Sequence, residues 1–380
     1  MSQHDNLFVT FKGTLQCNLA CLYCYGRNNQ SIGKSMSDEE IRNGLNFVCE
    51  YAKIMQAKRV SVCWHGGEPL LFSPERMNNL LEYASELFAS RNLLYDFTIQ
   101  TNGVLLTPQY YPIIRKYFNN FVGVSLDLFS DFRRNRNGID SMEKVVANID
   151  SALENGIACG VINLITRQNY DKIEQIYNFY KQRNISPRFA RVFPVSADYD
   201  KNSPMYLNDE EFASAMIQYF DLWVKDPKPA PNNDIVKLIG DLLLGRPSIC
   251  LREYNCAERY LALSPGGEIY SCAEFDVPES IIGNFLTQSP QDFANSNSRS
   301  ILFASAPIPE KCHSCRYETI CHGGCLRERF MLKYPFRCQS NILYWDHVLE
   351  WLGSKGGELF MLKGKEKKET IEVLQKIFNA

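Results

Sequence analysis

The sequence lacks an excess of charge of either sign, a long apolar run and an export signal. Its 41 basic and 43 acidic residues give a formal net charge of −2, which provides no electrostatic footprint for nucleic acid. No apolar stretch approaches the roughly 20 residues that a membrane-spanning helix needs. The N-terminal MSQHDNLFVTF has no basic segment followed by an apolar one. We therefore expect a cytoplasmic protein that binds neither nucleic acid nor membrane.

The length and the cysteine content suggest a metalloprotein with more than one part. A chain of 380 residues exceeds one compact domain, so a large domain with a smaller appendage is expected. Fourteen cysteines would suggest disulfides in a short exported chain, but in a long chain from a reducing compartment they suggest metal. Three of them, Cys49, Cys63 and Cys159, fall outside the motifs below and are expected to be small core residues.

The first 195 residues alternate strand-like and helix-like patterns, which predicts βα units around a parallel sheet. The expected strands are Leu7–Lys12, Arg59–His65, Leu94–Thr101, Phe121–Leu126, Ala158–Leu164 and Pro187–Phe193. The expected helices are Asp38–Gln56 with a Ser37/Glu40 capping box, one opening at Ser73-Pro74, Pro108–Phe118, Met142–Glu154 and Tyr170–Arg183. Six βα units are too few for a closed eight-stranded barrel, so the predicted fold is an α/β partial (β/α)6 TIM-like barrel.

Polar motifs follow four consecutive strands of this pattern. The first strand leads into Cys17, Cys21 and Cys24, and the second ends in His65-Gly66-Gly67-Glu68-Pro69. Gln100-Thr101-Asn102-Gly103 follows the third strand, and Ser125-Leu126-Asp127 ends the fourth. Because the carboxyl ends of parallel strands in α/β barrels meet at one mouth, we expect one site there.

The loop TLQCNLACLYCYG supplies three cysteines in a CxxxCxxC spacing and lacks a fourth. A [4Fe-4S] cube normally takes four thiolates, so three would leave one iron open to a small molecule. A zinc site is the alternative, although cysteine zinc sites usually close four ligands. Buried structural cysteines are a further alternative.

This spacing and its surroundings resemble the radical S-adenosylmethionine (SAM) superfamily. The resemblance implies that the open iron binds SAM and that an electron from the cluster releases a 5′-deoxyadenosyl radical, which abstracts a substrate hydrogen. It also implies that Tyr23 takes the aromatic position before the third cysteine and that Gly66, Gly67 and Glu68 meet the SAM ammonium group. Further SAM-binding candidates by the same resemblance are Gln100, Asn102, Ser125, and one of Arg133 or Arg134. Plain turns and solvated loop residues are the alternatives for these positions.

A second group of eight cysteines lies near the C-terminal end, and eight thiolates suffice for two fully ligated cubes. The spacing resembles the SPASM domain that follows many radical SAM cores. That resemblance implies one auxiliary cluster on Cys250, Cys256, Cys272 and Cys325, and another on Cys312, Cys315, Cys321 and Cys338. A pair of zinc ribbons is the alternative. Together the motifs predict three [4Fe-4S] clusters, with electron transfer as the role of the two auxiliary ones.

The expected organisation has four parts: a radical SAM core over 1–195, a helical and proline-rich connector over 196–247, a SPASM domain over 248–340 and a helical segment over 341–380. Helices are expected at Asn208–Trp223 and Asp234–Leu244, followed beyond Ser340 by a tryptophan-containing helix and a lysine-rich terminal helix. We expect no separate leader-binding domain, because the first strand begins at Leu7 and no spare domain remains.

The resemblance implies an enzyme that oxidises or crosslinks a side chain of a ribosomally made peptide or a protein. An external one-electron reductant such as flavodoxin or ferredoxin is implied as a partner. An anaerobic sulfatase-maturing enzyme is the second interpretation, but there an aspartate follows the cysteine equivalent to Cys272, and here that residue is Ala273. Glu274 and Asp276 are the nearby candidate bases. A non-catalytic zinc scaffold is the alternative from another class of protein.

Overall fold

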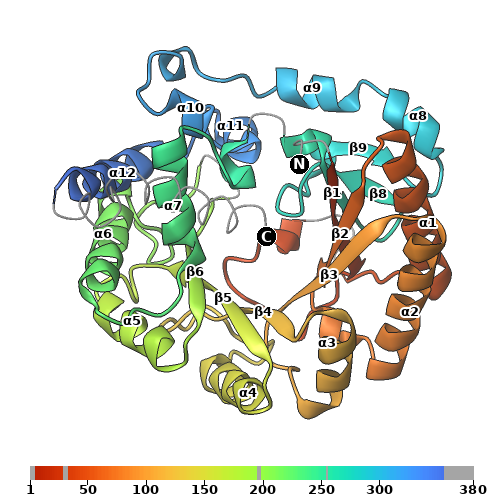
Figure 1. Cartoon of the computed structure of the whole chain (residues 1–380), viewed down its shortest axis with the longest axis horizontal. Helices are drawn as coiled ribbons and strands as arrows, with labels where there is room; N and C mark the ends of the chain where they lie inside the picture. Colours follow the sequence, from red (N-terminus) through yellow and green to blue (C-terminus); the bar gives the residue numbers. More distant parts are fainter. Residues whose placement is uncertain (1–4, 29–32, 195–197, 254–255, 355–380) are drawn as a thin grey trace, which may run out of the picture. The chain divides into compact units, whose positions relative to one another are not determined.

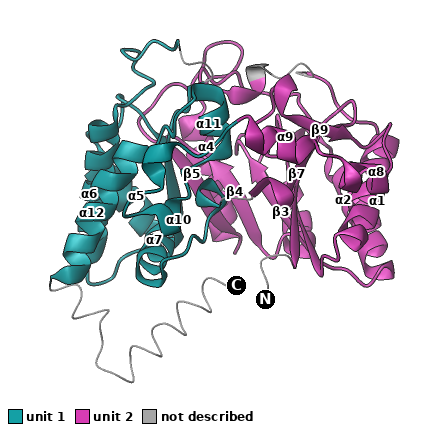
Figure 2. Ribbon diagram, turned by 90° about the horizontal axis from the view of Figure 1, so that it is seen from above, with its two compact units in different colours: residues 1, 164–254, 306–380 teal, residues 2–163, 255–305 magenta. Residues whose placement is uncertain are grey.

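The computed structural model describes residues 5–28, 33–194, 198–253 and 256–354 (Figure 1). The chain divides into two compact units (Figure 2). We call residues 2–163 and 255–305 the sheet unit, and residues 164–254 and 306–380 the helical unit. The expected lysine-rich terminal helix lies outside the described residues. No helix in the described ranges is long and apolar enough to cross a bilayer.

Within the sheet unit, the strands of an open sheet lie in the order β5-β4-β3-β2-β1-β7-β8-β9. Its strands are β1 (Asn6–Thr14), β2 (Arg59–Gly66), β3 (Leu94–Thr101), β4 (Phe121–Ser125), β5 (Ala158–Ile165), β7 (Tyr260–Leu263), β8 (Glu268–Tyr270) and β9 (Ile281–Asn284). β1 to β5 pair in parallel, and β7 pairs in parallel with the free side of β1. β8 and β9 complete the sheet with antiparallel pairs.

The helices of the sheet unit begin where the sequence provides caps. Ser37 and Glu40 form the predicted capping box of α1, with Glu40 N donating to Ser37 Oγ at 3.1 Å. Ser73 caps α2, which has Pro74 at its first position. The helices are α1 (Asp38–Ile54), α2 (Pro74–Ser90), α3 (Tyr111–Tyr117), α4 (Met142–Glu154), α8 (Pro290–Asn295) and α9 (Ser298–Ala304). The helix expected from Pro108 becomes a 3-10 turn followed by α3, because Pro112 at the start of α3 has no N–H to continue a longer helix.

Parallel register brings the strand ends that carry the polar motifs to one edge of the sheet. In the pair of β1 and β2, Lys12 lies opposite His65 and Thr14 lies opposite Gly66. The core beneath this edge is apolar, and the rings of Phe11 and Trp64 lie 5.6 Å apart with at most 1% exposure. We refer to this edge as the strand-end edge.

The strands β7 to β9 extend the sheet with residues from the cysteine-rich part of the sequence. β7 reads YLAL, and its last three residues are buried, as an interior strand requires. The stacked rings of Phe8 and Tyr260 lie 4.8 Å apart across the pair of β1 and β7. The cysteine pattern over 248–340 predicted only a compact cluster-binding part, and its short apolar strands carried no signal of where they pair.

The helical unit contains the short strand β6 and six helices in its described residues. These elements are α5 (Ile173–Gln182), β6 (Ser186–Arg191), α6 (Asp209–Lys225), α7 (Asn233–Leu244), α10 (Glu318–Cys321), α11 (Leu326–Leu332) and α12 (Cys338–Gly353). α6 packs against α5 and α12, and the ring of Phe220 meets that of Trp351 edge to face at 5.3 Å. The expected tryptophan-containing helix is α12.

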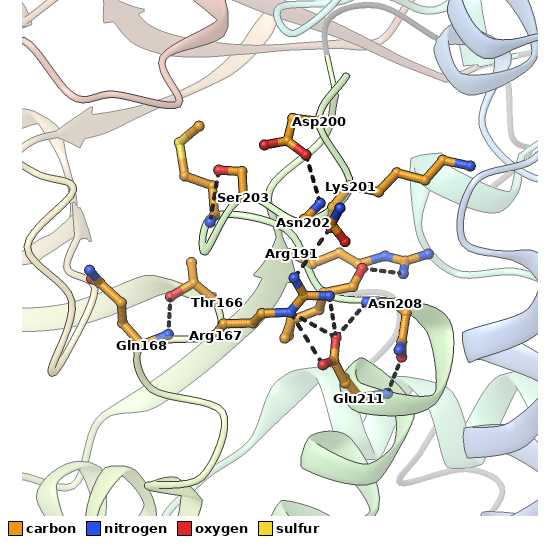
Figure 3. A network of polar contacts seen from close by, with 12 residues as sticks. Thr166, Arg167, Gln168, Arg191, Asp200, Lys201, Asn202, Ser203, Asn208 and Glu211 are labelled. Atoms are coloured by element: carbon orange, nitrogen blue, oxygen red, sulfur yellow. Dashed lines mark hydrogen bonds and ion pairs between the residues drawn. The ribbon is translucent and has the colours of Figure 1, made fainter. Parts of the chain in front are cut away.

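A polar network fixes the loop between β6 and α6 (Figure 3). Glu211 forms the capping box of α6 with Asn208. Its carboxylate also forms an ion pair with Arg167, whose Nε donates to Glu211 Oε1 at 3.2 Å. Arg167 Nη1 donates to Lys201 O at 3.3 Å. One arginine therefore ties the helix start to the preceding loop.

Candidate functional site

The CxxxCxxC loop leaves the end of β1 and is held by backbone hydrogen bonds to a second loop. Ala20 N donates to Arg134 O at 2.7 Å, and a similar bond at 3.0 Å follows two residues later. Cys17 and Cys21 are partly buried, whereas Cys24 is exposed. These backbone hydrogen bonds therefore hold the part of the chain that carries the three thiols at the strand-end edge.

The thiols of this loop lie close enough to affect one another's ionisation. Burial is the largest cause that raises the pKa of Cys17 and that of Cys21, the latter to about 11. Such thiols keep their protons until a metal displaces them.

The arrangement of thiols in the described residues bears on the type of metal site. The CxxxCxxC loop provides three thiols, one fewer than the four ligands that a cysteine zinc site usually closes. Three thiols suffice for three corners of a [4Fe-4S] cube, so the residues present fit such a cube.

Gly66 and Gly67 bring the end of β2 into backbone contact with the segment before Cys17. Gly67 N donates to Thr14 O at 2.7 Å. A Cβ at Gly67 would lie 2.0 Å from Gln16 O, and a Cβ at Gly66, where φ is +133°, would lie 2.1 Å from Thr14 O. No side chain larger than that of glycine fits either contact. The two glycines therefore position the cysteine loop, a role that the motif alone did not indicate.

Glu68 lies below the site and its carboxylate is directed at the chain itself. The residue is 0% exposed, and its carboxylate accepts hydrogen bonds from Leu70 N at 2.9 Å, Thr101 Oγ1 at 2.7 Å and Asn102 N at 2.7 Å. Burial raises the pKa of this carboxyl group, while the three donors favour its charged form. This arrangement assigns Glu68 to positioning Asn102, and it does not support the predicted direct contact with a ligand ammonium group.

Polar side chains from β3 and β4 lie beside the cysteine loop. Asn102 Nδ2 donates to Asn18 Oδ1 at 2.7 Å and lies 3.6 Å from Cys17 Sγ. Gln100 Nε2 donates to Ser125 Oγ at 3.1 Å across neighbouring strands. The structure therefore brings three of the predicted polar residues to the strand-end edge. Asn18 was not predicted, although it directly follows the first cysteine.

The structure distinguishes Arg133 from Arg134. Arg133 is 5% exposed, and its guanidinium donates to Asn102 O at 3.0 Å and to Tyr23 Oη at 3.4 Å. Its Nε is a buried donor without a partner among the described residues. Arg134 is partly exposed and forms an ion pair with Asp131. Of the two candidates, Arg133 is the one that is buried beside Tyr23 and Asn102.

Asp127 joins Tyr23 and Arg133 in a buried polar group next to Cys21. The phenol of Tyr23 donates to the Asp127 carboxylate. Burial, followed by the charge of Asp127, holds the pKa of Tyr23 well above its usual range. The sequence predicted no role for Asp127 within its motif, because Tyr23 and Arg133 belong to other loops.

The two candidate bases occupy different environments. Asp276 is 4% exposed and its carboxylate lies 2.9 Å from Lys12 Nζ, whereas Glu274 is exposed. Burial, and then the charge of Lys12, lowers the pKa of the nearby His65 to about 4. Lys12 and His65 were not predicted as site residues. The available signal was that Lys12 is the one charged residue of β1, which reads NLFVTFKGT.

The C-terminal cysteines are distributed over both units. Cys312, Cys315, Cys321 and Cys338 all belong to the helical unit, as do Cys250 and Cys325, whereas Cys256 and Cys272 belong to the sheet unit. Burial, and then the neighbouring Cys338, raises the pKa of Cys321 to about 11. In the helical unit, the quartet expected to hold one cube therefore has thiols within mutual electrostatic reach.

Three consecutive residues with positive φ, His322, Gly323 and Gly324, form a tight backbone wrap before Cys325. The buried Arg329 stabilises this wrap by donating to Gly323 O at 3.3 Å and Gly324 O at 2.5 Å. His322 Nδ1 lies 3.0 Å from a backbone carbonyl within the same unit. The wrap orients the segment that joins two cysteines of the motif.

We expect Gly67→Ala to displace the cysteine loop. The added Cβ would clash with a backbone oxygen, which side-chain movement cannot relieve, at a cost of about 1–3 kcal/mol in the free energy of unfolding. Iron content and chemical denaturation measure the effect. Gly353→Ala is the matched control, because nothing lies within 4 Å of a Cβ there. Unchanged iron binding and stability in Gly67→Ala would contradict the assigned contact.

The low pKa of His65 predicts a pH dependence of stability. In the unfolded chain His65 is protonated near pH 6.5, whereas in the folded protein it is protonated only near pH 4. The free energy of unfolding therefore falls as the pH decreases between these values. Above about pH 6.5 this contribution is constant. Thermal unfolding of wild type and His65→Gln between pH 7.5 and 5.5 measures it. The wild-type melting temperature should fall more steeply, and parallel curves would contradict the prediction.

Comparison with known proteins identifies the core. The family model described as the radical SAM superfamily matches residues 12–180. A serine-type anaerobic sulfatase-maturating enzyme from Bacteroides thetaiotaomicron is 26% identical over 386 aligned residues, which cover 90% of this chain and 89% of that protein. The similarity therefore extends beyond the core into the cysteine-rich part.

Solved structures share the fold. Native anSMEcpe with bound AdoMet and Kp18Cys peptide superimposes with a TM-score of 0.80 at 20% identity, covering 91% of this chain and 98% of that one. Streptococcus suis SuiB bound to the precursor peptide SuiA gives a TM-score of 0.61 at 19% identity, covering 87% and 74%. The predicted α/β fold with an open parallel sheet is confirmed. Residues 12–180 form a radical SAM domain, as the cysteine motif predicted.

Proposed function

We propose that this enzyme binds SAM at a [4Fe-4S] cluster on Cys17, Cys21 and Cys24 and modifies a side chain of a peptide or protein. The observation that carries the proposal is a loop with three thiols, fixed by backbone contacts and bordered by buried polar side chains. When bound, the cluster and SAM supply a 5′-deoxyadenosyl radical that abstracts a hydrogen atom. The peptide substrate is supported by the similarity to SuiB bound to a precursor peptide and to anSMEcpe bound to a peptide.

The polar residues around the loop suit the groups of SAM. The unpartnered Nε of Arg133 is a buried donor for a carboxylate, since a guanidinium offers several donors in one plane. Gln100 and Ser125, already joined by a hydrogen bond, offer amide and hydroxyl groups for ribose hydroxyls. In this proposal Asn102 and Tyr23 border the same pocket, and Glu68 and Asp127 hold them in place.

We propose that the eight C-terminal cysteines hold two auxiliary [4Fe-4S] clusters with the ligand sets given above. Fully ligated clusters suit electron transfer, so they would accept the electron left after hydrogen abstraction and give a net two-electron oxidation of the substrate. An external one-electron reductant such as flavodoxin or ferredoxin would supply the first electron. This number of cysteines in a long chain suits a reducing compartment, which supports a cytoplasmic location.

Formation of formylglycine in a sulfatase is the second candidate function. It is favoured by similarity over about nine-tenths of the chain to a protein named as an anaerobic sulfatase-maturating enzyme. The replacement of the expected aspartate by Ala273 counts against it. A crosslink or another oxidation in a ribosomally made peptide is the alternative that this difference favours.

Metal analysis and SAM cleavage test the proposal. Anaerobically reconstituted protein should contain about twelve irons, at four per cube, and should form 5′-deoxyadenosine when reduced with SAM. Cys21→Ser should lose about a third of the iron and all of the 5′-deoxyadenosine. Cys49→Ala is the control, because this buried cysteine belongs to neither motif. Zinc without iron, with no SAM cleavage by the wild type, would favour a scaffold and contradict the proposal.

Glu274→Gln tests the proposed base. We expect this variant to cleave SAM as the wild type does but to form product about 100-fold more slowly, because the substrate proton loses its acceptor. Mass spectrometry would measure product formation from two synthetic peptides. One is a short peptide encoded next to the gene of this protein, and the other carries the segment of a sulfatase that is modified. Glu279→Gln, a change at an exposed position nearby, is the control. Undiminished product formation by Glu274→Gln would remove this residue from the mechanism.

A further inference from the structure

Lys12 is a buried lysine within β1 that contacts a distant loop. Its residue exposure is 1%, and its Nζ donates to Ala273 O at 2.6 Å and to Asp276 Oδ2 at 2.9 Å. The two acceptors stand at either end of a four-residue segment that follows the short strand β8. One ammonium group therefore holds the 272–276 loop at two points, by a backbone and a side-chain oxygen.

Stability alone does not account for this ion pair. Removing an ammonium and a carboxylate from water costs several kcal/mol for each ion, and well-packed apolar residues of similar volume often fold as well. A buried ammonium must keep its acceptors within hydrogen-bond distance, so the pair favours one conformation of the loop among those that an apolar contact would tolerate. The pair of Lys12 and Asp276 therefore specifies geometry.

The loop so fixed carries groups that the proposed reaction needs. It begins at Cys272, one of the proposed cluster ligands, and includes the exposed Glu274. Lys12 lies opposite His65 in the register of β1 and β2, and both Glu274 and Asp276 act on the pKa of that imidazole. The ammonium also lies 5.5 Å from the ring centre of Tyr25, just beyond the CxxxCxxC loop. The loop and the cysteine motif are therefore linked through Lys12.

We propose that Lys12 is a positioning residue that fixes the 272–276 loop at the strand-end edge, with Asp276 as its counter-ion and Glu274 as the carboxylate presented to substrate. The inference rests on the proposed function, since it assigns the roles within that site. It separates two carboxylates that the sequence left equivalent. Asp276 is occupied in holding the loop, and the exposed Glu274 accepts the proton.

Substitution of Lys12 tests the inference with two independent readouts in anaerobically reconstituted protein. Lys12→Met should raise backbone amide exchange in residues 272–276 by about tenfold or more, because the hydrogen bonds that order the loop are lost. It should keep SAM cleavage but lower kcat for peptide modification by about 100-fold with little change in KM, since misplacement by about 1 Å has this effect. Lys12→Arg should partly restore both the slow amide exchange of the loop and the kcat for peptide modification.

Lys58→Met is the matched control, because Lys58 pairs with Asp5 at the opposite end of the same strands and is largely exposed. It should leave both readouts at wild-type values. If Lys12→Met lacks iron or does not fold, Lys12→Met/Asp276→Leu replaces the pair by apolar side chains and carries the same expectations. Wild-type loop exchange and wild-type kcat in whichever of these variants folds would overturn the inference.

A comparison of the two carboxylates completes the test. Asp276→Asn keeps an oxygen for Lys12 and should retain product formation to within about tenfold, whereas Glu274→Gln should not. The opposite ranking would overturn the assignment. Failure of the wild type to form 5′-deoxyadenosine would refute the proposed function. The amide exchange measurement would still test whether Lys12 fixes the 272–276 loop.

Discussion

The close backbone contact between the end of β2 and the end of β1 is the constraint on which the site depends. Gly67 N bonds to Thr14 O, and no Cβ can enter the gap between Gly67 and Gln16. This contact sets the position from which the cysteine loop starts. The remaining groups of the site, from Asn102 to Arg133, are placed relative to that start by hydrogen bonds from neighbouring strand ends.

Among the described residues of the sheet unit, most of the buried charged side chains lie at this edge, and most of them are paired. Glu68 accepts three hydrogen bonds, Asp127 accepts one from the phenol of Tyr23, and Asp276 accepts one from the ammonium of Lys12. Such groups are costly to bury and tolerate little displacement, so they hold their neighbours more rigidly than apolar packing would. The Nε of Arg133 remains without a partner among the described residues, which suits a role in binding an anionic group.

The sequence predicted the six strands of the βα units, their order and the edge at which the motifs meet, because hydrophobic periodicity and turn residues are local signals. The capping box at Ser37 is a similar local signal and was found as predicted. The sequence could not predict that the Glu68 carboxylate is hydrogen-bonded within the protein, that Arg133 rather than Arg134 is buried, or that Lys12 contacts Asp276. These features depend on contacts between residues that are far apart in sequence, and the residue types alone do not encode them.

The central claim is that the first cube is held by three thiolates and binds SAM at its fourth iron. Electron paramagnetic resonance of the reduced protein, recorded with and without SAM, tests it most directly. The account predicts that SAM shifts the signal of one cluster and that this cluster is missing when Cys17, Cys21 and Cys24 are replaced by alanine. A spectrum that SAM leaves unchanged in the fully reconstituted wild type would contradict it.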